Sequence, residues 1–354
     1  MCKDFLEDMQ APVPADIQRL ETFLASAKRV SVVVHTHPDG DAVGSGAAML
    51  AYLRQCRGLE ARLLLPDASP ASLDFALPAE GVIVATREPE AASAWIAASD
   101  LVVCLDMNGF SRAEALAAPL QDSKASKVLI DHHLNPDRAS FDLVFSETEI
   151  SSACELLYRV LLALPGVGEA GRLPLSVLTA LMTGMTTDTN NFANSVFPST
   201  LQMASELLAA GVDRDALLDN LYHNYRENRL RAMGACLQER MHITPEGAAC
   251  IVLDRAFIDR YDLQDGETEG FVNLPLGIGR VRISLLLRED DGHFRVSIRS
   301  KEGVSANRLA TEAFHGGGHE RAAGGKLFFP QDIAGPAQAE EYLADVTARF
   351  MRKK

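Results

Sequence analysis

Three short apolar runs, each followed at once by a histidine or an aspartate, constrain the fold of this chain more than any other feature. The runs are residues 32–34 before His35, residues 101–105 before Asp106, and residues 127–130 before Asp131. Their content of valine, leucine and isoleucine predicts buried strands. Helical segments lie between the runs, so parallel pairing is expected, and the three ends then meet at one edge of a sheet.

The polar residues at these strand ends are of the types that bind metal ions. The first run leads into His35-Thr36-His37-Pro38-Asp39-Gly40-Asp41, and the third leads into Asp131-His132-His133. Histidine and carboxylate ligands together suit Mn, Fe, Zn or Mg. The first stretch alone could equally be a solvated turn, because Asp, Pro and Gly are ordinary turn residues. The repetition at three strand ends favours a site that holds more than one metal ion.

Two predicted helices lie next to the candidate metal-binding residues in the sequence. Residues 42–55 form the first, and Gly44 and Gly46 stand in its first turns. Glycine inside a helix costs about 1 kcal/mol relative to alanine, so we expect another backbone or a ligand to approach closely there. Residues 174–187 form the second helix, which runs into the polar stretch 186–192. Asp188 in that stretch is either a further metal-binding carboxylate or a capping residue on a surface loop.

The pattern of elements predicts an α/β protein of two domains. Residues 1–195 would form a parallel-sheet domain with flanking helices, which carries the candidate metal site. Residues 196–240 would form a helical linker with helices over residues 199–210 and 213–231. Residues 241–354 would form a smaller mixed α/β domain with strands over residues 248–253, 280–287 and 294–298. Asp290-Asp291-Gly292 predicts a hairpin between the last two strands.

The second domain contains a locally basic region with a glycine run. Residues 280–326 hold nine basic and six acidic side chains, in a chain of net charge -14. Arg299 at a strand end could bind phosphate oxygens through its guanidinium, or it could be a solvated strand terminus. Gly316-Gly317-Gly318 stands before a predicted helix, where bare N–H groups could bind an anion together with His319. A flexible surface loop is the alternative.

Composition excludes several classes of protein. The chain has 354 residues, of which 47% are hydrophobic and 23% charged, and its acidity argues against wrapping long nucleic acid. None of the six cysteines forms a CxxC pair, so a zinc ribbon is disfavoured, and mostly buried free thiols in a reducing cytoplasm are expected. The N-terminus MCKDFLEDMQ does not have the pattern of a signal peptide, and no apolar run approaches a membrane span.

The chain resembles the DHH phosphoesterase family. The resemblance rests on His35 to Ala42, Asp106, Asp131-His132-His133 and Thr187-Asp188, which match the four family motifs in order. Residues 315–325, with Arg299 before them, resemble the glycine-rich signature of the DHH-associated C-terminal domain. The two-domain layout is that of the small members, which include nanoRNases and phosphatases of adenosine 3′,5′-bisphosphate (pAp).

The resemblance implies two Mn²⁺ ions, for which Mg²⁺ or another divalent ion could stand, and a role for each motif residue. One ion would be held by His35, Asp39 and Asp188, the other by Asp41 and His132, and both by Asp106. His133 would lie beside the scissile phosphate, and Asp131 would orient a histidine. His37 stands at a variable position and is not expected to bind metal. Arg299, Gly317, Gly318 and His319 would bind the phosphate or the terminal nucleotide of the substrate.

The leading hypothesis is therefore a manganese-dependent phosphoesterase that acts on short oligoribonucleotides, linear dinucleotides or pAp. A cyclic-dinucleotide phosphodiesterase and an exopolyphosphatase-like hydrolase are alternatives, and the Gly-Gly-Gly-His sequence argues against a family II pyrophosphatase. A non-catalytic nucleotide-binding module is disfavoured because all six metal-ligand positions are filled. The expected partner is a short nucleotide substrate, without long nucleic acid or membrane, and a second copy of the chain could be another.

Overall fold

The first half of the chain is built on a six-stranded parallel sheet. The computed structural model describes residues 12–352 and divides the chain into two compact units, Met1–Asn224 and Tyr225–Lys354. The sheet of the first unit has the order β3-β2-β1-β4-β5-β6. Its strands are β1 (Arg29–Val33), β2 (Glu60–Leu65), β3 (Val82–Val84), β4 (Leu101–Leu105), β5 (Ser126–Asp131) and β6 (Leu143–Ser146). The predicted parallel α/β architecture is confirmed.

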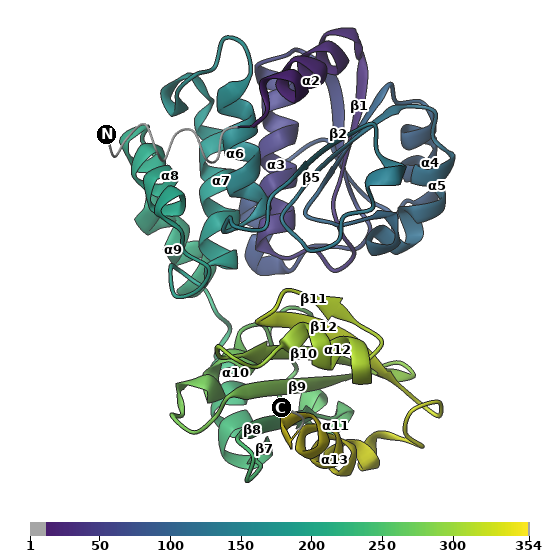
Figure 1. Ribbon diagram of the computed structural model, residues 1–354, viewed down its shortest axis with the longest axis vertical. Helices are drawn as coiled ribbons and strands as arrows, with labels where there is room; N and C mark the ends of the chain where they lie inside the picture. The colour runs from purple at the N-terminus through teal and green to yellow at the C-terminus, as the bar shows by residue number, and fades with distance from the viewer. Residues whose placement is uncertain (1–11, 353–354) are drawn as a thin grey trace. The chain divides into compact units, whose positions relative to one another are not determined.

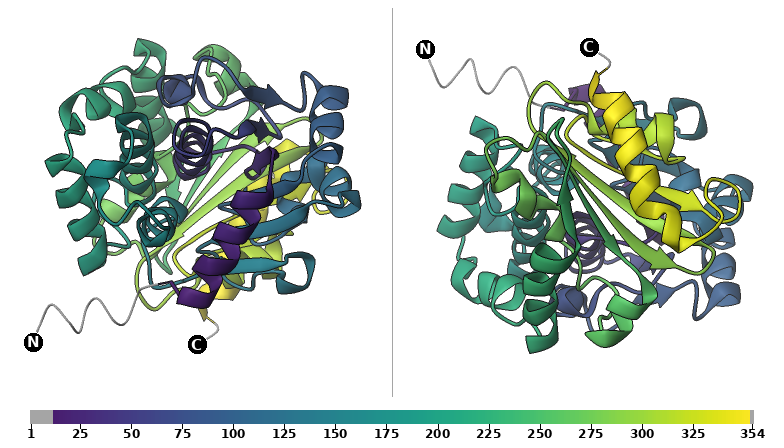
Figure 2. Two further views of the ribbon diagram at one scale, coloured as in Figure 1. Left: turned by 90° about the horizontal axis from the view of Figure 1, so that it is seen from above. Right: turned by 90° about the horizontal axis from the view of Figure 1, so that it is seen from below.

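Helices cover both faces of this sheet (Figure 1). On one face lie α2 (Pro14–Ser26), α3 (Gly40–Gln55), α6 (Ala153–Ala163) and α7 (Leu175–Asp188). On the other lie α4 (Pro89–Ala97) and α5 (Ala117–Asp122). Successive strand residues point to opposite faces, so Val32 and Val103 join the first layer, whereas Val33 and Val102 join the second. Figure 2 (left) shows the two helix layers on opposite sides of the strands.

The strand order reverses between β1 and β4, which are neighbours in the centre of the sheet. The chain passes outward from β1 to β2 and β3, then returns to β4 on the other side of β1. Open α/β sheets bind ligands beyond the carboxyl ends of the strands at such a switch point. The strands that precede His35 and Asp106 are therefore the two that flank the favoured ligand position.

The predicted long helix over residues 213–231 is wrong. The structure has two helices here, α9 (Arg214–Tyr222) and α10 (Glu227–Ala235), after α8 (Pro198–Ala209). The break falls on His223-Asn224-Tyr225, and Arg226 is extended with φ -62° and ψ 143°. His, Asn and Tyr are all weak helix formers, and three in succession end the helix. The division between the two compact units falls in this break.

The second unit is a mixed sheet with the order β11-β12-β10-β9-β8-β7. Its strands are β7 (Met241–Ile243), β8 (Ala248–Leu253), β9 (Ile283–Asp290), β10 (His293–Ser300), β11 (Gly317–Gly318) and β12 (Ala322–Phe328). Among these pairings, only that of β8 with β9 is parallel. Helices α12 (Ala306–Ala313) and α13 (Ala339–Arg352) cover one face, and α10 and α11 (Arg255–Arg260) cover the other. The predicted hairpin is present, with Gly292 at φ 76°.

The glycine run does not precede a helix, contrary to the prediction. Gly317 and Gly318 form the edge strand β11, which pairs with β12. A Cβ at Gly318 would lie 2.7 Å from the carbonyl oxygen of Ala322, and its φ is 140°. Gly318 is therefore needed for close approach between two strands. A sequence pattern does not distinguish this requirement from a loop before a helix.

Two further expectations concern the surface and the thiols. Among residues 12–352, no helix is both long and apolar enough to cross a membrane. Cys104, Cys154, Cys236 and Cys250 are buried free thiols, as expected, whereas Cys56 is exposed. Cys2 and the expected absence of a signal peptide fall outside the described residues.

Candidate metal centre

The carboxyl ends of β1, β4 and β5 bring three predicted ligands together. Val33 pairs with Cys104 and Leu105 pairs with Ile130, so the three strands end side by side. The Nε2 atom of His35 lies 3.4 Å from Oδ2 of Asp106, and Nε2 of His132 lies 3.4 Å from Oδ1 of the same carboxylate. Asp106 thus stands between the two histidines, which is the position that the family resemblance assigns to a shared ligand.

The start of α3 adds two more carboxylates. Asp39 is the N-cap of this helix, and its Oδ1 accepts hydrogen bonds from the N–H groups of Asp41 and Ala42 at 3.1 and 3.2 Å. The same oxygen lies 3.7 Å from Nε2 of His35. Asp41 follows in the first turn, where its Oδ2 lies 3.7 Å from Nε2 of His132. Capping therefore fixes the two acidic side chains next to different histidines.

A second helix start holds Asp41 from the opposite side. The N–H groups of Ala153 and Cys154, in the first turn of α6, donate to the two carboxylate oxygens of Asp41 at 2.6 and 3.0 Å. Positive partial charge at a helix N-terminus stabilises a carboxylate. Sequence reasoning missed this support. The Ser152 cap does indicate where α6 begins, but nothing in the sequence indicates which residue its N–H groups face.

Close packing of α3 against α7 positions Asp188 next to the other acidic side chains of the cluster. A Cβ at Gly44 would lie 2.6 Å from the carbonyl oxygen of Ala180, so the backbone approach expected at this glycine is present. A Cβ at Gly184 would lie 2.7 Å from Oδ1 of Asp41. Gly46 instead accommodates the side chain of Leu63. Asp188, the last residue of α7, consequently places its Oδ2 3.6 Å from Nε2 of His132.

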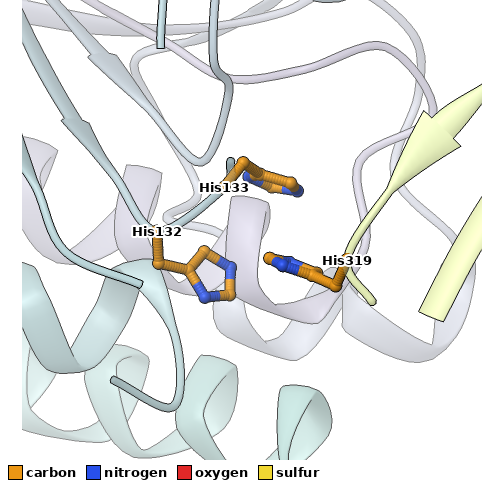
Figure 3. Close-up of side chains that lie close together, drawn as sticks. All are labelled: His132, His133 and His319. Carbon is orange, nitrogen blue, oxygen red and sulfur yellow. The ribbon is translucent and has the colours of Figure 1, made fainter. Parts of the chain in front are cut away.

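His132 and His133 are adjacent but have different partners. Their ring centroids are 4.9 Å apart with an interplanar angle of 68°, and both rings are drawn in Figure 3. The Nδ1 atom of His133 lies 2.7 Å from Oδ1 of Asp131 and 3.6 Å from Oδ1 of Asp106. Asp131 thus orients His133 at the edge of the cluster. His37, which was not expected to bind metal, faces Asp67 instead, with Nδ1 3.4 Å from its Oδ2.

The two histidines of the cluster are held in the charged form by their neighbours. Burial lowers the pKa of His35, but Asp106 and Asp39 outweigh it and raise that pKa to about 10. Burial also lowers the pKa of His132, but Asp106 and Asp188 outweigh it and raise that pKa to about 10. In the absence of other cations, the imidazolium groups are thus the main source of positive charge for these carboxylates.

The pKa values of the carboxylates are shifted in opposite directions by burial and by neighbouring charges. Burial raises the pKa of Asp188 to about 6, with the charges of Asp39 and Asp106 adding to the effect. Burial and Asp106 also raise the pKa of Asp41 well above its ordinary value. At Asp106 itself, burial is outweighed by His132 and His35, which hold the pKa well below the usual range. Four carboxylates are therefore crowded into a space that two histidines neutralise only in part.

This donor set fits divalent metal ions. Ligand atoms lie within 4.8 Å of one another in the group His35, Asp39 and Asp106 and in the group Asp41, Asp106 and His132. Oδ1 of Asp106 is buried and accepts no hydrogen bond within the part of the chain that the structure describes. Buried polar atoms are rarely left without a partner. A cation at the junction of the two groups would provide that partner and offset the carboxylate charge.

The predicted substrate-binding residues lie on β10, on β11 and directly after β11, on either side of β12 in the second unit. Arg299 on β10 pairs with Ala322 on β12, and Gly318 on β11 pairs with Ala323. The N–H group of His319 donates to the carbonyl oxygen of Ala322 at 2.7 Å. Gly317 pairs with Gly324 in the same ladder. The four residues predicted to bind substrate are therefore brought together within this unit.

Sequence comparison identifies both units. Residues 29–185 match the model for the DHH family, N-terminal domain, and residues 250–350 match the model for the DHHA1 domain. The chain belongs to the DHH family of phosphoesterases. It is therefore an enzyme that hydrolyses phosphate esters, and the cluster at the sheet edge is its candidate metal centre.

Relatives of known name span nearly the whole chain. The bifunctional oligoribonuclease and PAP phosphatase NrnA of Bacillus subtilis (strain 168) is 27% identical over 304 residues, which cover 84% of this chain and 90% of the relative. The protein of the same name from Thermus thermophilus is 29% identical over 332 residues, which cover 90% of this chain and 92% of that relative.

A solved structure shares the fold throughout. The exopolyphosphatase-related protein from Bacteroides fragilis matches with a TM-score of 0.87 and 31% identity, and the match covers 96% of this chain and 97% of that protein. Both units thus have counterparts in one related chain.

Proposed function

We propose that this protein is a manganese-dependent phosphoesterase that hydrolyses short oligoribonucleotides, linear dinucleotides and pAp. The arrangement around Asp106 is the observation that supports this most directly, because one buried carboxylate lies 3.4 Å from a histidine of each metal-binding group. The names of the two NrnA relatives, which align along more than four-fifths of the chain, support the class of substrate.

Each residue of the cluster has a proposed task. The family resemblance groups Asp188 with His35 and Asp39 at one ion, but its carboxylate lies 3.6 Å from Nε2 of His132. On this geometry His35 and Asp39 would hold one ion, Asp41, His132 and Asp188 would hold the other, and Asp106 would contact both. A pair of divalent ions bound by these residues would activate a water molecule and would neutralise charge on the phosphate oxygens.

The remaining groups orient the reactants. Asp131 would accept a hydrogen bond from Nδ1 of His133 and so orient the ring that would lie beside the scissile phosphate. Arg299, Gly317, Gly318 and His319 of the second unit would bind the phosphate or terminal nucleotide. In the net reaction water adds to phosphorus, the bond from phosphorus to the 3′ oxygen breaks, and the 3′-hydroxyl leaves with a proton. Products therefore carry a 5′-phosphate.

The test is the release of mononucleotide from a two- to five-residue RNA, from pApA and from pAp, with and without Mn²⁺. The Asp106→Ala variant serves as the control, since it removes the shared ligand. Hydrolysis that depends on Mn²⁺ and is lost in the variant is the expected result. Full activity in the variant would contradict the assignment of Asp106. A cyclic dinucleotide, pyrophosphate and polyphosphate, assayed in parallel, would reveal a different substrate class.

A further inference from the structure

A polar cavity lies in the first unit, at the edge of the sheet that carries the metal centre. Its volume is about 400 Å³, and its lining consists of residues 108–111, Gln121, Asn135, Asp137 and Ser140. The first of these segments begins two residues after Asp106, and the second begins two residues after His133. The cavity is therefore built by the loops that follow β4 and β5, but it shares no residue with the metal-binding groups.

The lining has the chemistry of a site for a neutral polar ring. Five of its side chains carry an amide or a hydroxyl group, and these are Asn108, Ser111, Gln121, Asn135 and Ser140. Asp137 is the only charged side chain in the lining, which contains no lysine or arginine. Anion sites rely on cationic donors, so a phosphate is disfavoured. Amide groups both donate and accept, which matches the ring nitrogens and exocyclic groups of a nucleobase.

The shape of the cavity is fixed by bonds between its two loops. The side chain of Asn108 donates to the carbonyl oxygen of Leu134 at 3.1 Å, and the N–H group of Asp137 donates to the carbonyl oxygen of Asn108 at 2.7 Å. Ser140 donates to Asp137 at 2.6 Å. Below them, the buried ring of Phe110 packs on Phe141 with centroids 4.8 Å apart. The volume lies within the range of about 300–1,000 Å³ that small-molecule sites occupy.

We infer that this cavity binds the nucleobase of the nucleotide that keeps the scissile phosphate. The inference rests on the proposed function. In pApA the scissile phosphate joins the 3′ oxygen of one nucleoside to the 5′ oxygen of the next, whereas in pAp nothing follows the 3′-phosphate. The cavity therefore binds a base of dinucleotides and of longer RNA, whereas pAp has no base that would occupy it. It sets the preference of the enzyme between these two kinds of substrate.

The Gln121→Ala variant tests the inference with Mn²⁺ present. Gln121 is exposed on α5, so the change removes an amide from the cavity without opening the core. We expect the ratio of kcat/KM for pApA to kcat/KM for pAp to fall about three- to tenfold, the range for loss of one hydrogen bond. Gln18→Ala, a matched change at an exposed position of α2, is expected to leave that ratio as in the wild type.

A second variant fills the cavity instead of removing a partner. Ser111→Phe adds a ring at an exposed lining position, and we expect it to lower the same ratio more than tenfold. If the wild-type enzyme is active and both Gln121→Ala and Ser111→Phe keep its ratio of kcat/KM for pApA to kcat/KM for pAp, the inference about the cavity is wrong. The proposed function would stand in that case. A wild-type enzyme that hydrolyses neither pAp nor pApA would overturn the proposed function and this inference together.

Discussion

At the scale of single residues, the contact between Asp131 and His133 makes a sharp prediction. The Asp131→Asn substitution removes the negative charge that holds His133 at 2.7 Å, but it leaves intact the two groups to which the metal ions are assigned, His35 with Asp39 and Asp41 with His132 around Asp106. We expect kcat to fall roughly ten- to a hundredfold, the usual range for loss of such a supporting partner. Steady-state kinetics on pAp measures kcat, and titration with Mn²⁺ measures affinity, which should change much less.

The matched control for this variant is Asp259→Asn, an exposed aspartate on α11. Its kcat should equal that of the wild type. If Asp131→Asn abolished Mn²⁺ binding while His133→Ala did not, Asp131 would be a metal ligand and the positioning role would be wrong.

The raised pKa values of His35 and His132 predict how the stability of the metal-free protein depends on pH. Both stand at about 10 in the folded chain against an ordinary value of 6.5. The stability from their charged forms is complete below pH 6.5 and is lost as the pH rises toward 10. With a chelator present, we expect the free energy of unfolding to fall continuously across this window. Urea denaturation at several pH values measures it.

Bound Mn²⁺ should change this profile, because a histidine ligand is neutral and the metal then competes with protons. The decline with rising pH should therefore be smaller with Mn²⁺ than with the chelator. The His132→Gln variant, measured with the chelator, should also show a shallower decline. A metal-free protein that became more stable between pH 6.5 and 9 would contradict the assigned charge state.

Sequence reasoning at this scale named the residues but not their contacts. His35, Asp39, Asp41 and Asp106 follow from strand ends and a turn, and the structure brings their side chains together. The link from Asp41 to the N–H groups of α6 joins positions 112 and 113 residues apart. No local pattern contains that link, because it depends on how α3 and α6 pack. Asp188 could be proposed from the family motif, whereas its contact with His132 required the structure.

At the scale of elements, the packing of α3 on α7 controls the position of two acidic residues. The Gly44→Ala variant would place a Cβ 2.6 Å from the carbonyl oxygen of Ala180 and 2.8 Å from the N atom of Gly184. Backbone atoms cannot move aside as a side-chain end can, so the helices must separate. We expect a loss of about 1–3 kcal/mol in the free energy of unfolding, the usual cost of overpacking, together with weaker Mn²⁺ binding.

Gly234→Ala in α10 is the control for this substitution, because a Cβ there would meet no atom within 4 Å. Replacing a helical glycine by alanine at such a position should leave stability unchanged or raise it. Urea denaturation and Mn²⁺ titration of both variants provide the measurement. Equal behaviour of the two would mean that the approach of α3 to α7 does not position Asp41 and Asp188.

Helices and strands were predicted correctly where the apolar pattern of the sequence was strong. The prediction failed where contacts between backbone segments determined the secondary structure. The strands that carry the site were predicted within a few residues, because their apolar runs are short and sharply bounded. The glycine run was wrongly assigned to the start of a helix, since the pairing of Gly317 with Gly324 is a contact between strands. The helix predicted over residues 213–231 joined two separate helices, because the three weak helix formers at 223–225 carry only a modest signal in a charged segment.

At the scale of the whole molecule, each unit has hydrophobic cores of its own. The described clusters of the first unit contain residues 17–221, and those of the second contain residues 232–350. The candidate metal centre lies wholly in the first unit, and the predicted phosphate-binding strands lie wholly in the second. Two separate cores make two cooperative unfolding transitions the natural expectation for this chain.

Metal binding should therefore stabilise one transition selectively. A ligand that binds only the folded state raises stability by about 2.7 kcal/mol at a hundredfold excess over its dissociation constant. We expect calorimetry to show two transitions and Mn²⁺ to raise the midpoint of one by several degrees while the other stays fixed. Asp106→Ala should abolish the shift, because it removes the ligand shared by both metal groups, whereas Arg299→Ala in the second unit should preserve it. Equal shifts in both transitions would show that the two units unfold together, and a shift retained in Asp106→Ala would place the metal elsewhere.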